Sequence, residues 1–236
     1  MIVTGKKLLH APFFEIGPKQ YLYGDAVLEL AQIADEASRR HKVQVIFTAP
    51  FPDIRRVAEN TTDILVFAPH MDDIPVGRGL ADILPESVRA AGADGVLLNH
   101  VERPLPYAKV SSTVERARSL DMLTLVLADT VNEAKAVALL RPDVITAEPT
   151  ELIGTGTTTS DLDYIHDAVE AVRAISPETF VLIGAGISSG SDVYNVIRAG
   201  ADASGSSSAV ARATDQEALV NEMLQAARQA WDETHP

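Results

Sequence analysis

Short apolar runs recur along nearly the whole chain, and each is only a few residues long. Most are rich in Val, Ile, Leu and Phe, which is typical of strands buried on both faces. The eight runs are Pro12–Ile16, Val43–Thr48, Ile64–Ala68, Gly95–Leu98, Leu123–Leu127, Val144–Ala147, Phe180–Gly184 and, with the weakest pattern, Ala201–Gly205. We therefore expect eight buried strands.

Segments with helical spacing of apolar residues lie between these runs. The clearest apolar stripe consists of Leu28, Leu30, Ile33, Ala34 and Ala37. Similar periodicity runs through residues 163–175 and 193–197, so all three segments are expected to be amphipathic helices.

Regular alternation of strands and helices favours a parallel sheet. Eight repeats in 236 residues favour closure into a (β/α)8 barrel, an α/β fold that commonly takes about 250 residues. An open flavodoxin-like or Rossmann sheet is the alternative. No long Pro-, Gly- or Ser-rich linker interrupts the pattern, so residues 1–236 are predicted to form a single domain.

Composition limits the classes of partner. The net charge of −13 repels nucleic acids and anionic membrane surfaces, but oriented backbone amides still allow a small phosphate to bind. The chain has no cysteine, which excludes disulfides, thiolate nucleophiles and cysteine-ligated metals. Because no apolar run approaches the roughly 20 residues of a membrane span and no signal-peptide pattern begins the chain, we expect a cytoplasmic protein.

Chemically capable residues follow several of the predicted strands. Loops after the strands of such a barrel converge on one face, where chemistry takes place. Lys19 follows the first run, His100 the fourth and Glu148 the sixth, and loops that contain Gly or Ser follow the last three. A carboxylate base, an imidazole, a cation and amide-rich loops favour proton abstraction next to the carbonyl of a phosphorylated compound.

Three segments carry a family resemblance. The segments AEPTELIGTG (Ala147–Gly156), GAGISSG (Gly184–Gly190) and LLNHVER (Leu97–Arg103) resemble triosephosphate isomerases, especially the short archaeal type, and order and spacing agree from Phe13 to about Val210. The resemblance implies a TIM barrel and an intramolecular oxidoreductase that interconverts aldose and ketose phosphates. It also implies a homo-oligomer, dimer or tetramer, and chemistry that uses no cofactor and no metal.

The resemblance assigns roles to individual residues. Glu148 would be the catalytic base, His100 the electrophile that polarises the carbonyl, and Lys19 the active-site cation. Glu102 would be the family's buried acidic neighbour, and the loop Pro149–Gly156 would close over the substrate. Backbone N–H groups for the phosphate would come from Gly154, Gly186, Ser207 and Ser208.

The sequence departs from the family pattern at three places. Gly17 replaces an asparagine two residues before the lysine, Val101 replaces a serine, and serines replace two glycines in the last loop. Gly17 removes a side-chain donor and is expected to open space beside the substrate, so a tetrose or tetrulose phosphate becomes an alternative to a triose phosphate. A strict glycolytic triosephosphate isomerase, another phosphate-binding lyase or synthase, and a non-catalytic sugar-phosphate sensor remain further alternatives.

His70 lies near Asp72 and Asp73, three side chains of the kinds that ligate divalent metals. Two adjacent aspartates do not easily converge on one histidine, so we favour a loop or subunit contact within Pro69–Leu80.

Overall fold

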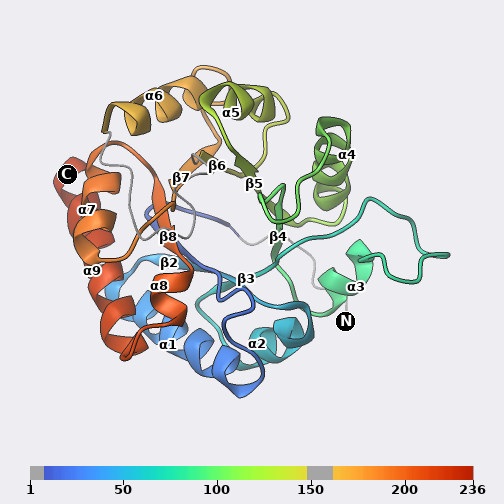
Figure 1. The fold of residues 1–236 in the computed structure, drawn as a ribbon, viewed down its shortest axis with the longest axis horizontal. Coiled ribbons are helices and arrows are strands. Elements are labelled where there is room, and N and C mark those ends of the chain that lie inside the picture. Colours follow the sequence, from blue (N-terminus) through green and yellow to red (C-terminus); the bar gives the residue numbers. More distant parts are fainter. Residues whose placement is uncertain (1–7, 148–161, 236) are drawn as a thin grey trace.

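The computed structural model describes residues 8–147 and 162–235, which form a ring of strands surrounded by helices (Figure 1). The strands are β1 (Phe13–Ile16), β2 (Gln44–Thr48), β3 (Leu65–Ala68), β4 (Gly95–Leu98), β5 (Leu123–Ala128), β6 (Val144–Ala147), β7 (Phe180–Ile183) and β8 (Ala203–Ser206). The helices are α1 (Asp25–His41), the 3-10 turn η1 (Phe51–Asp53), α2 (Ile54–Asn60), α3 (Pro85–Ala90), α4 (Tyr107–Arg118), α5 (Val131–Ala138), α6 (Leu162–Arg173), α7 (Gly190–Arg198), α8 (Ser208–Ala211) and α9 (Gln216–Thr234).

The sheet is closed. Each strand pairs in parallel with its neighbours in chain order, and β1 also pairs with β8, where Phe13 lies opposite Ala203 and Glu15 opposite Gly205. This closure confirms the predicted (β/α)8 barrel and rules out the open doubly wound sheet.

Two layers of apolar side chains hold the barrel together. The outer layer lies between strands and helices and includes the buried face of α1, from Val27 to Ala37. The inner layer fills the barrel and takes alternate residues of its strands, because successive side chains of a strand point to opposite faces. Its members are Phe13, Ile46, Leu65, Phe67, Leu123, Leu125, Leu127, Val144, Leu182 and Ala203.

The eighth strand begins two residues later than predicted and ends one residue later, at Ser206. Its sequence ASGS contains no large apolar residue, yet all four positions are buried. Ser204 donates to the carbonyl of Ile183 at 2.9 Å, and Ser206 donates to that of Ile187 at 3.0 Å. Satisfied hydroxyls explain how serines occupy a buried strand.

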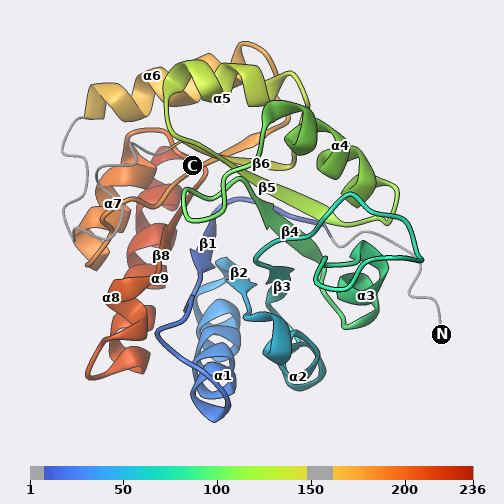
Figure 2. The same ribbon diagram turned by 45° about the vertical axis from the view of Figure 1, so that its right-hand side comes forward.

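One loop extends well away from the barrel. Residues 69–84, between β3 and α3, project to one side in both ribbon views (Figures 1 and 2). Val76 and Leu80 in this loop are among the most exposed large apolar residues in the described part of the chain. Within the described ranges no helix is both long enough and apolar enough to cross a membrane.

Candidate active site

A cavity of about 350 Å³ lies where the carboxyl ends of the strands meet. Residues following β1, β2, β3, β4, β7 and β8 line its mouth, and strand residues line its floor inside the barrel. The polar or charged lining side chains include Glu15, Lys19, Thr48, His70, His100, Glu102, Arg103 and Thr146. Leucines from β4, β5 and β7 form the apolar floor.

His100 is held as a neutral imidazole with a defined tautomer. Its Nδ1 accepts the backbone N–H of Glu102 at 3.0 Å, so Nδ1 carries no proton. The remaining ring proton therefore resides on Nε2. Desolvation lowers the pKa of His100, and the Lys19 ammonium lowers it further, outweighing the opposite influence of Glu102 and Asp129. His100 thus presents a neutral N–H donor at neutral pH.

Two residues at the site have a left-handed backbone conformation. Lys19 has φ 48° and Asn99, directly before His100, has φ 59°. Such a conformation costs a residue like Lys19 about 1–2 kcal/mol, whereas asparagine adopts it more readily. The Asn99 amide holds its turn by donating to the carbonyl of Leu127 at 2.9 Å and accepting the N–H of Leu105 at 2.9 Å.

Lys19 and Glu102 form an ion pair across the cavity mouth, with Lys19 Nζ 3.1 Å from Glu102 Oε1. The expectation that Glu102 is buried is wrong for this chain, because its side chain is 67% exposed. The turn from His100 to Arg103, closed by the Arg103 N–H to His100 carbonyl bond at 2.7 Å, lifts Glu102 to the surface. Glu102 nevertheless positions the ammonium of Lys19.

The expected phosphate-binding residues after β7 and β8 lie at the same cavity. Gly186, Ser207 and Ser208 all line it, and Gly186 has φ 72°, a conformation that glycine adopts without strain. Ser207 Oγ donates to the carbonyl of Gly17 at 2.7 Å, which links the loop after β8 to the loop after β1.

The predicted open space beside Gly17 is filled. A Cβ added to Gly17 would lie 2.9 Å from Oε1 of Glu15. The carboxyl of Glu15 thus occupies the room that a side chain at position 17 would need, although Gly17 itself lines the cavity as expected.

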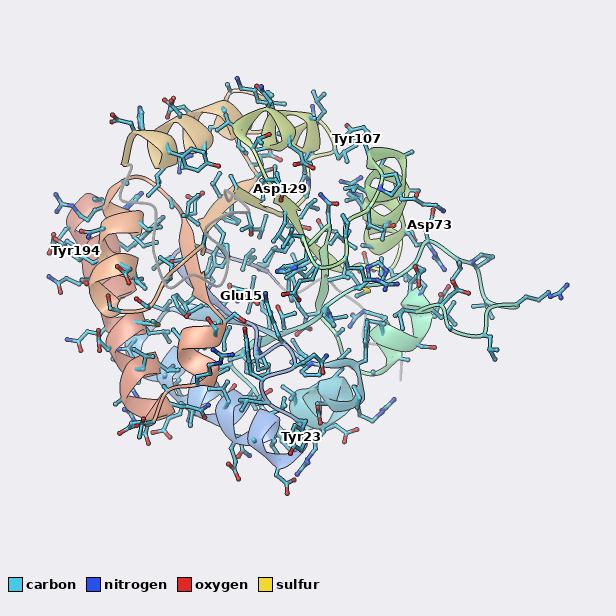
Figure 3. All side chains as sticks on the ribbon, in the orientation of Figure 1. Glu15, Tyr23, Asp73, Tyr107, Asp129 and Tyr194 are labelled. Carbon is cyan, nitrogen blue, oxygen red and sulfur yellow. The ribbon has the colours of Figure 1, made fainter. Side chains whose placement is uncertain are left out.

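Glu15 is the residue that sequence reasoning missed. It lies within the apolar run that forms β1, and its side chain shares the inward face of this strand with Phe13. Figure 3 shows it inside the ring of strands. Burial raises the pKa of Glu15 to about 7, although a hydrogen bond from Thr48 and the charge of Lys19 act in the opposite direction. The sequence signal that could have identified Glu15 as a site residue is a single acidic residue within an otherwise apolar strand.

Two expected site residues, Glu148 and Gly154, and the loop Pro149–Gly156, lie outside the described residues. β6 ends at Ala147, and Thr146 of this strand lines the cavity. The hydroxyl of Thr146 is buried and has no hydrogen-bond partner within the described ranges.

His70 lines the cavity, but only one of the two neighbouring aspartates contacts it. Asp72 contacts His70 at 3.2 Å and accepts the N–H of Ile83, whereas Asp73 turns away to Lys109 at 2.7 Å. Burial lowers the pKa of His70. The aspartates therefore stabilise the base of the projecting loop.

Comparisons with known proteins agree with this geometry. The family model described as triosephosphate isomerase matches residues 19–223. The triosephosphate isomerase of Sulfolobus acidocaldarius is 35% identical over 89% of this chain and 91% of the relative. Those of Methanothermus fervidus and Methanocaldococcus jannaschii are 36% and 35% identical over 85% of the chain, covering 91% and 92% of their own lengths. With a closed barrel, a neutral His100 beside Lys19 at its mouth, and matches along most of its length, the chain belongs to the triosephosphate isomerase family.

Proposed function

We propose that the chain interconverts the aldose and ketose forms of a small phosphorylated sugar with three or four carbons. The observation that carries this proposal is the meeting of His100, Lys19 and the loops after β7 and β8 around one cavity. Such a cavity can bind the phosphate at one side while a donor and a cation face the carbonyl at the other.

In this proposal Glu148 removes a proton from the carbon next to the carbonyl and returns it to the neighbouring carbon. Its assignment rests on the family segment that begins at Ala147 and on its place directly after β6. A carboxylate at the end of a strand suits this task, because a rigid strand fixes the position from which it reaches the substrate.

His100 would donate its Nε2–H to the carbonyl oxygen as negative charge develops there. A neutral imidazole is a weaker acid than an imidazolium, so it stabilises the enediolate by a hydrogen bond without needing a change of protonation state. The Lys19 ammonium would neutralise part of the charge on the enediolate and on the phosphate.

The phosphate would bind to main-chain N–H groups of Gly154, Gly186, Ser207 and Ser208. This mode of binding needs few cations, which suits a chain with a net charge of −13.

Cavity size supports a small substrate. Ligand pockets commonly range from about 300 to 1,000 Å³, and the present cavity of about 350 Å³ lies near the lower end. The relatives named above are triosephosphate isomerases, which supports a triose phosphate. The cavity also continues into the barrel past Leu97 and Leu125, which leaves a four-carbon sugar phosphate in the proposal.

The test is a steady-state comparison of glyceraldehyde 3-phosphate with four-carbon ketose phosphates, using kcat/KM for each. Glu148→Asp should lower kcat by about 10²-fold on the better substrate, since it withdraws the carboxylate by one methylene. Glu178→Asp, the same change at an exposed position preceding β7 at the opposite end of the barrel, is the matched control. No interconversion of any of these sugars, or full turnover by Glu148→Asp, would overturn the proposal.

We also propose that the chain forms a homo-oligomer through the loop Pro69–Leu80. Val76 and Leu80 project from this loop and are largely exposed to solvent in the single chain. Replacing both by Asp should shift the molecular mass measured by light scattering toward that of one chain, and an unchanged mass would exclude this contact.

A further inference from the structure

We propose that the carboxyl of Glu15 contacts the substrate and, in its protonated form, donates its O–H to an oxygen at the reacting end of the sugar. This inference rests on the proposed isomerase activity. It gives Glu15 the donor function that the family's asparagine, replaced here by Gly17, would otherwise supply.

Two glycines make room for this carboxyl. A Cβ at Gly17 would lie 2.9 Å from Glu15 Oε1, and a Cβ at Gly205 of β8 would lie 3.3 Å from Oε2 and 3.1 Å from the Glu15 Cβ. Gly205 is directly opposite Glu15 in the β1–β8 register. The carboxyl therefore lies beside two glycines, one directly after β1 and one in β8, and lines the cavity.

The carboxyl is anchored on one side only. Thr48 Oγ1 donates to Glu15 Oε1 at 2.5 Å, and within the described residues no other hydrogen bond to Glu15 is found. The ammonium of Lys19 contacts Glu102 at 3.1 Å, and within the described ranges no ion pair joins Lys19 to Glu15. Oε2 therefore has no hydrogen-bond partner among the described residues, and because Glu15 lines the cavity, a substrate oxygen would be its partner.

Burial, together with the negative charge of a bound substrate, favours the protonated acid over the opposing charge of Lys19. The titratable side chains that line the cavity with Glu15, among the described residues, are Lys19, Tyr21, His70, His100, Glu102 and Arg103. Burial already raises the pKa of Glu15 to about 7. A bound phosphate dianion and a developing enediolate add negative charge nearby, which raises the pKa further. A neutral carboxyl can donate to the enediolate, whereas a carboxylate would repel it.

The experiment is the pH profile of kcat/KM for the wild type, Glu15→Gln and, as a matched control, Glu178→Gln. Wild type and control should lose kcat/KM about tenfold per pH unit above roughly pH 7, as Glu15 ionises in the free enzyme. Glu15→Gln keeps the shape and an N–H donor but cannot ionise, so it should retain activity within about tenfold at pH 6.5 and lose the alkaline decline. Glu15→Ala, which has no donor, should lose about 10²-fold or more.

An alkaline decline that is the same in wild type and Glu15→Gln would overturn the Glu15 proposal while leaving the isomerase proposal intact. A wild type that turns over none of the sugars overturns the proposed function instead. If circular dichroism shows that Glu15→Gln does not fold, Glu15→Asp replaces it as the test. A kcat reduced at least tenfold, with the alkaline decline retained, supports contact between Glu15 and the substrate. An unchanged kcat refutes that contact.

Discussion

Thr48 lowers the pKa of Glu15 against the larger effect of burial, and removing its hydroxyl gives a quantitative prediction. The Thr48 O–H to Glu15 Oε1 bond is 2.5 Å long and stabilises the carboxylate more than the neutral acid. Thr48→Val keeps the shape of the side chain at a buried position and deletes the donor.

The magnitude follows from the two protonation states. A hydrogen bond to a charged group contributes about 1.5–3 kcal/mol, and one between neutral groups about 0.5–1.5 kcal/mol. The carboxylate therefore loses about 1–1.5 kcal/mol more than the acid, which at about 1.36 kcal/mol per pH unit raises the pKa by about one unit. The pKa should move from about 7 to one unit higher.

The assay is a ¹³C NMR titration of the Glu15 side-chain carboxyl, assigned by its disappearance in Glu15→Gln. The alkaline limb of kcat/KM should move by the same amount as the NMR titration. Ser204→Ala, which removes another buried hydroxyl of the barrel whose bond goes to the carbonyl of Ile183, is the control. A pKa of Glu15 that stays fixed or falls in Thr48→Val would refute the assigned hydrogen bond and the reasoning built on it.

Three further predictions follow from the same structure. Lys19→Met should raise the pKa of His100 in an NMR titration, because the ammonium lowers it, and should reduce kcat/KM by 10²-fold or more. Glu15→Gln should stabilise the protein against urea increasingly as pH rises from 4.5 to 7. The folded pKa of Glu15, about 7, exceeds its ordinary value of 4.5, so the wild type loses up to about 3 kcal/mol of folding stability across that window. Equal urea midpoint shifts at pH 5 and pH 8 would contradict this. Gly95→Ala should destabilise the barrel by about 1–3 kcal/mol, because its Cβ would lie 2.4 Å from the Phe67 ring. Adding Phe67→Leu to this variant should restore part of the lost stability, as measured by thermal unfolding.

Most of the fold could be predicted because buried parallel strands are apolar on both faces. The runs Gly95–Leu98 and Val144–Ala147 match β4 and β6 residue for residue. The pattern that predicted β8 was the weakest, because this strand is buried through serine hydroxyls that bond to carbonyls after and within neighbouring β7. The sequence of β8 alone does not show these bonds.

The site was harder to predict, because side-chain placement depends on residues distant in the chain. Lys19, His100 and the loops of Gly186 and Ser207 could be recognised from their positions after strands. The filling of the space beside Gly17 by Glu15 could not be predicted, because it depends on the room that Gly205 of β8 leaves for the Glu15 side chain. The exposure of Glu102 likewise depends on a turn that its own sequence does not specify.

The most direct measurement of the central claim is the isomerisation of glyceraldehyde 3-phosphate and of a four-carbon ketose phosphate in D₂O, followed by proton NMR. Proton transfer by a side-chain carboxylate exchanges with solvent, so product should carry deuterium at the carbon that receives the proton, and Glu148→Gln should abolish both product and label. Product that forms without deuterium, or a Glu148→Gln variant that labels as fast as the wild type, would contradict the account.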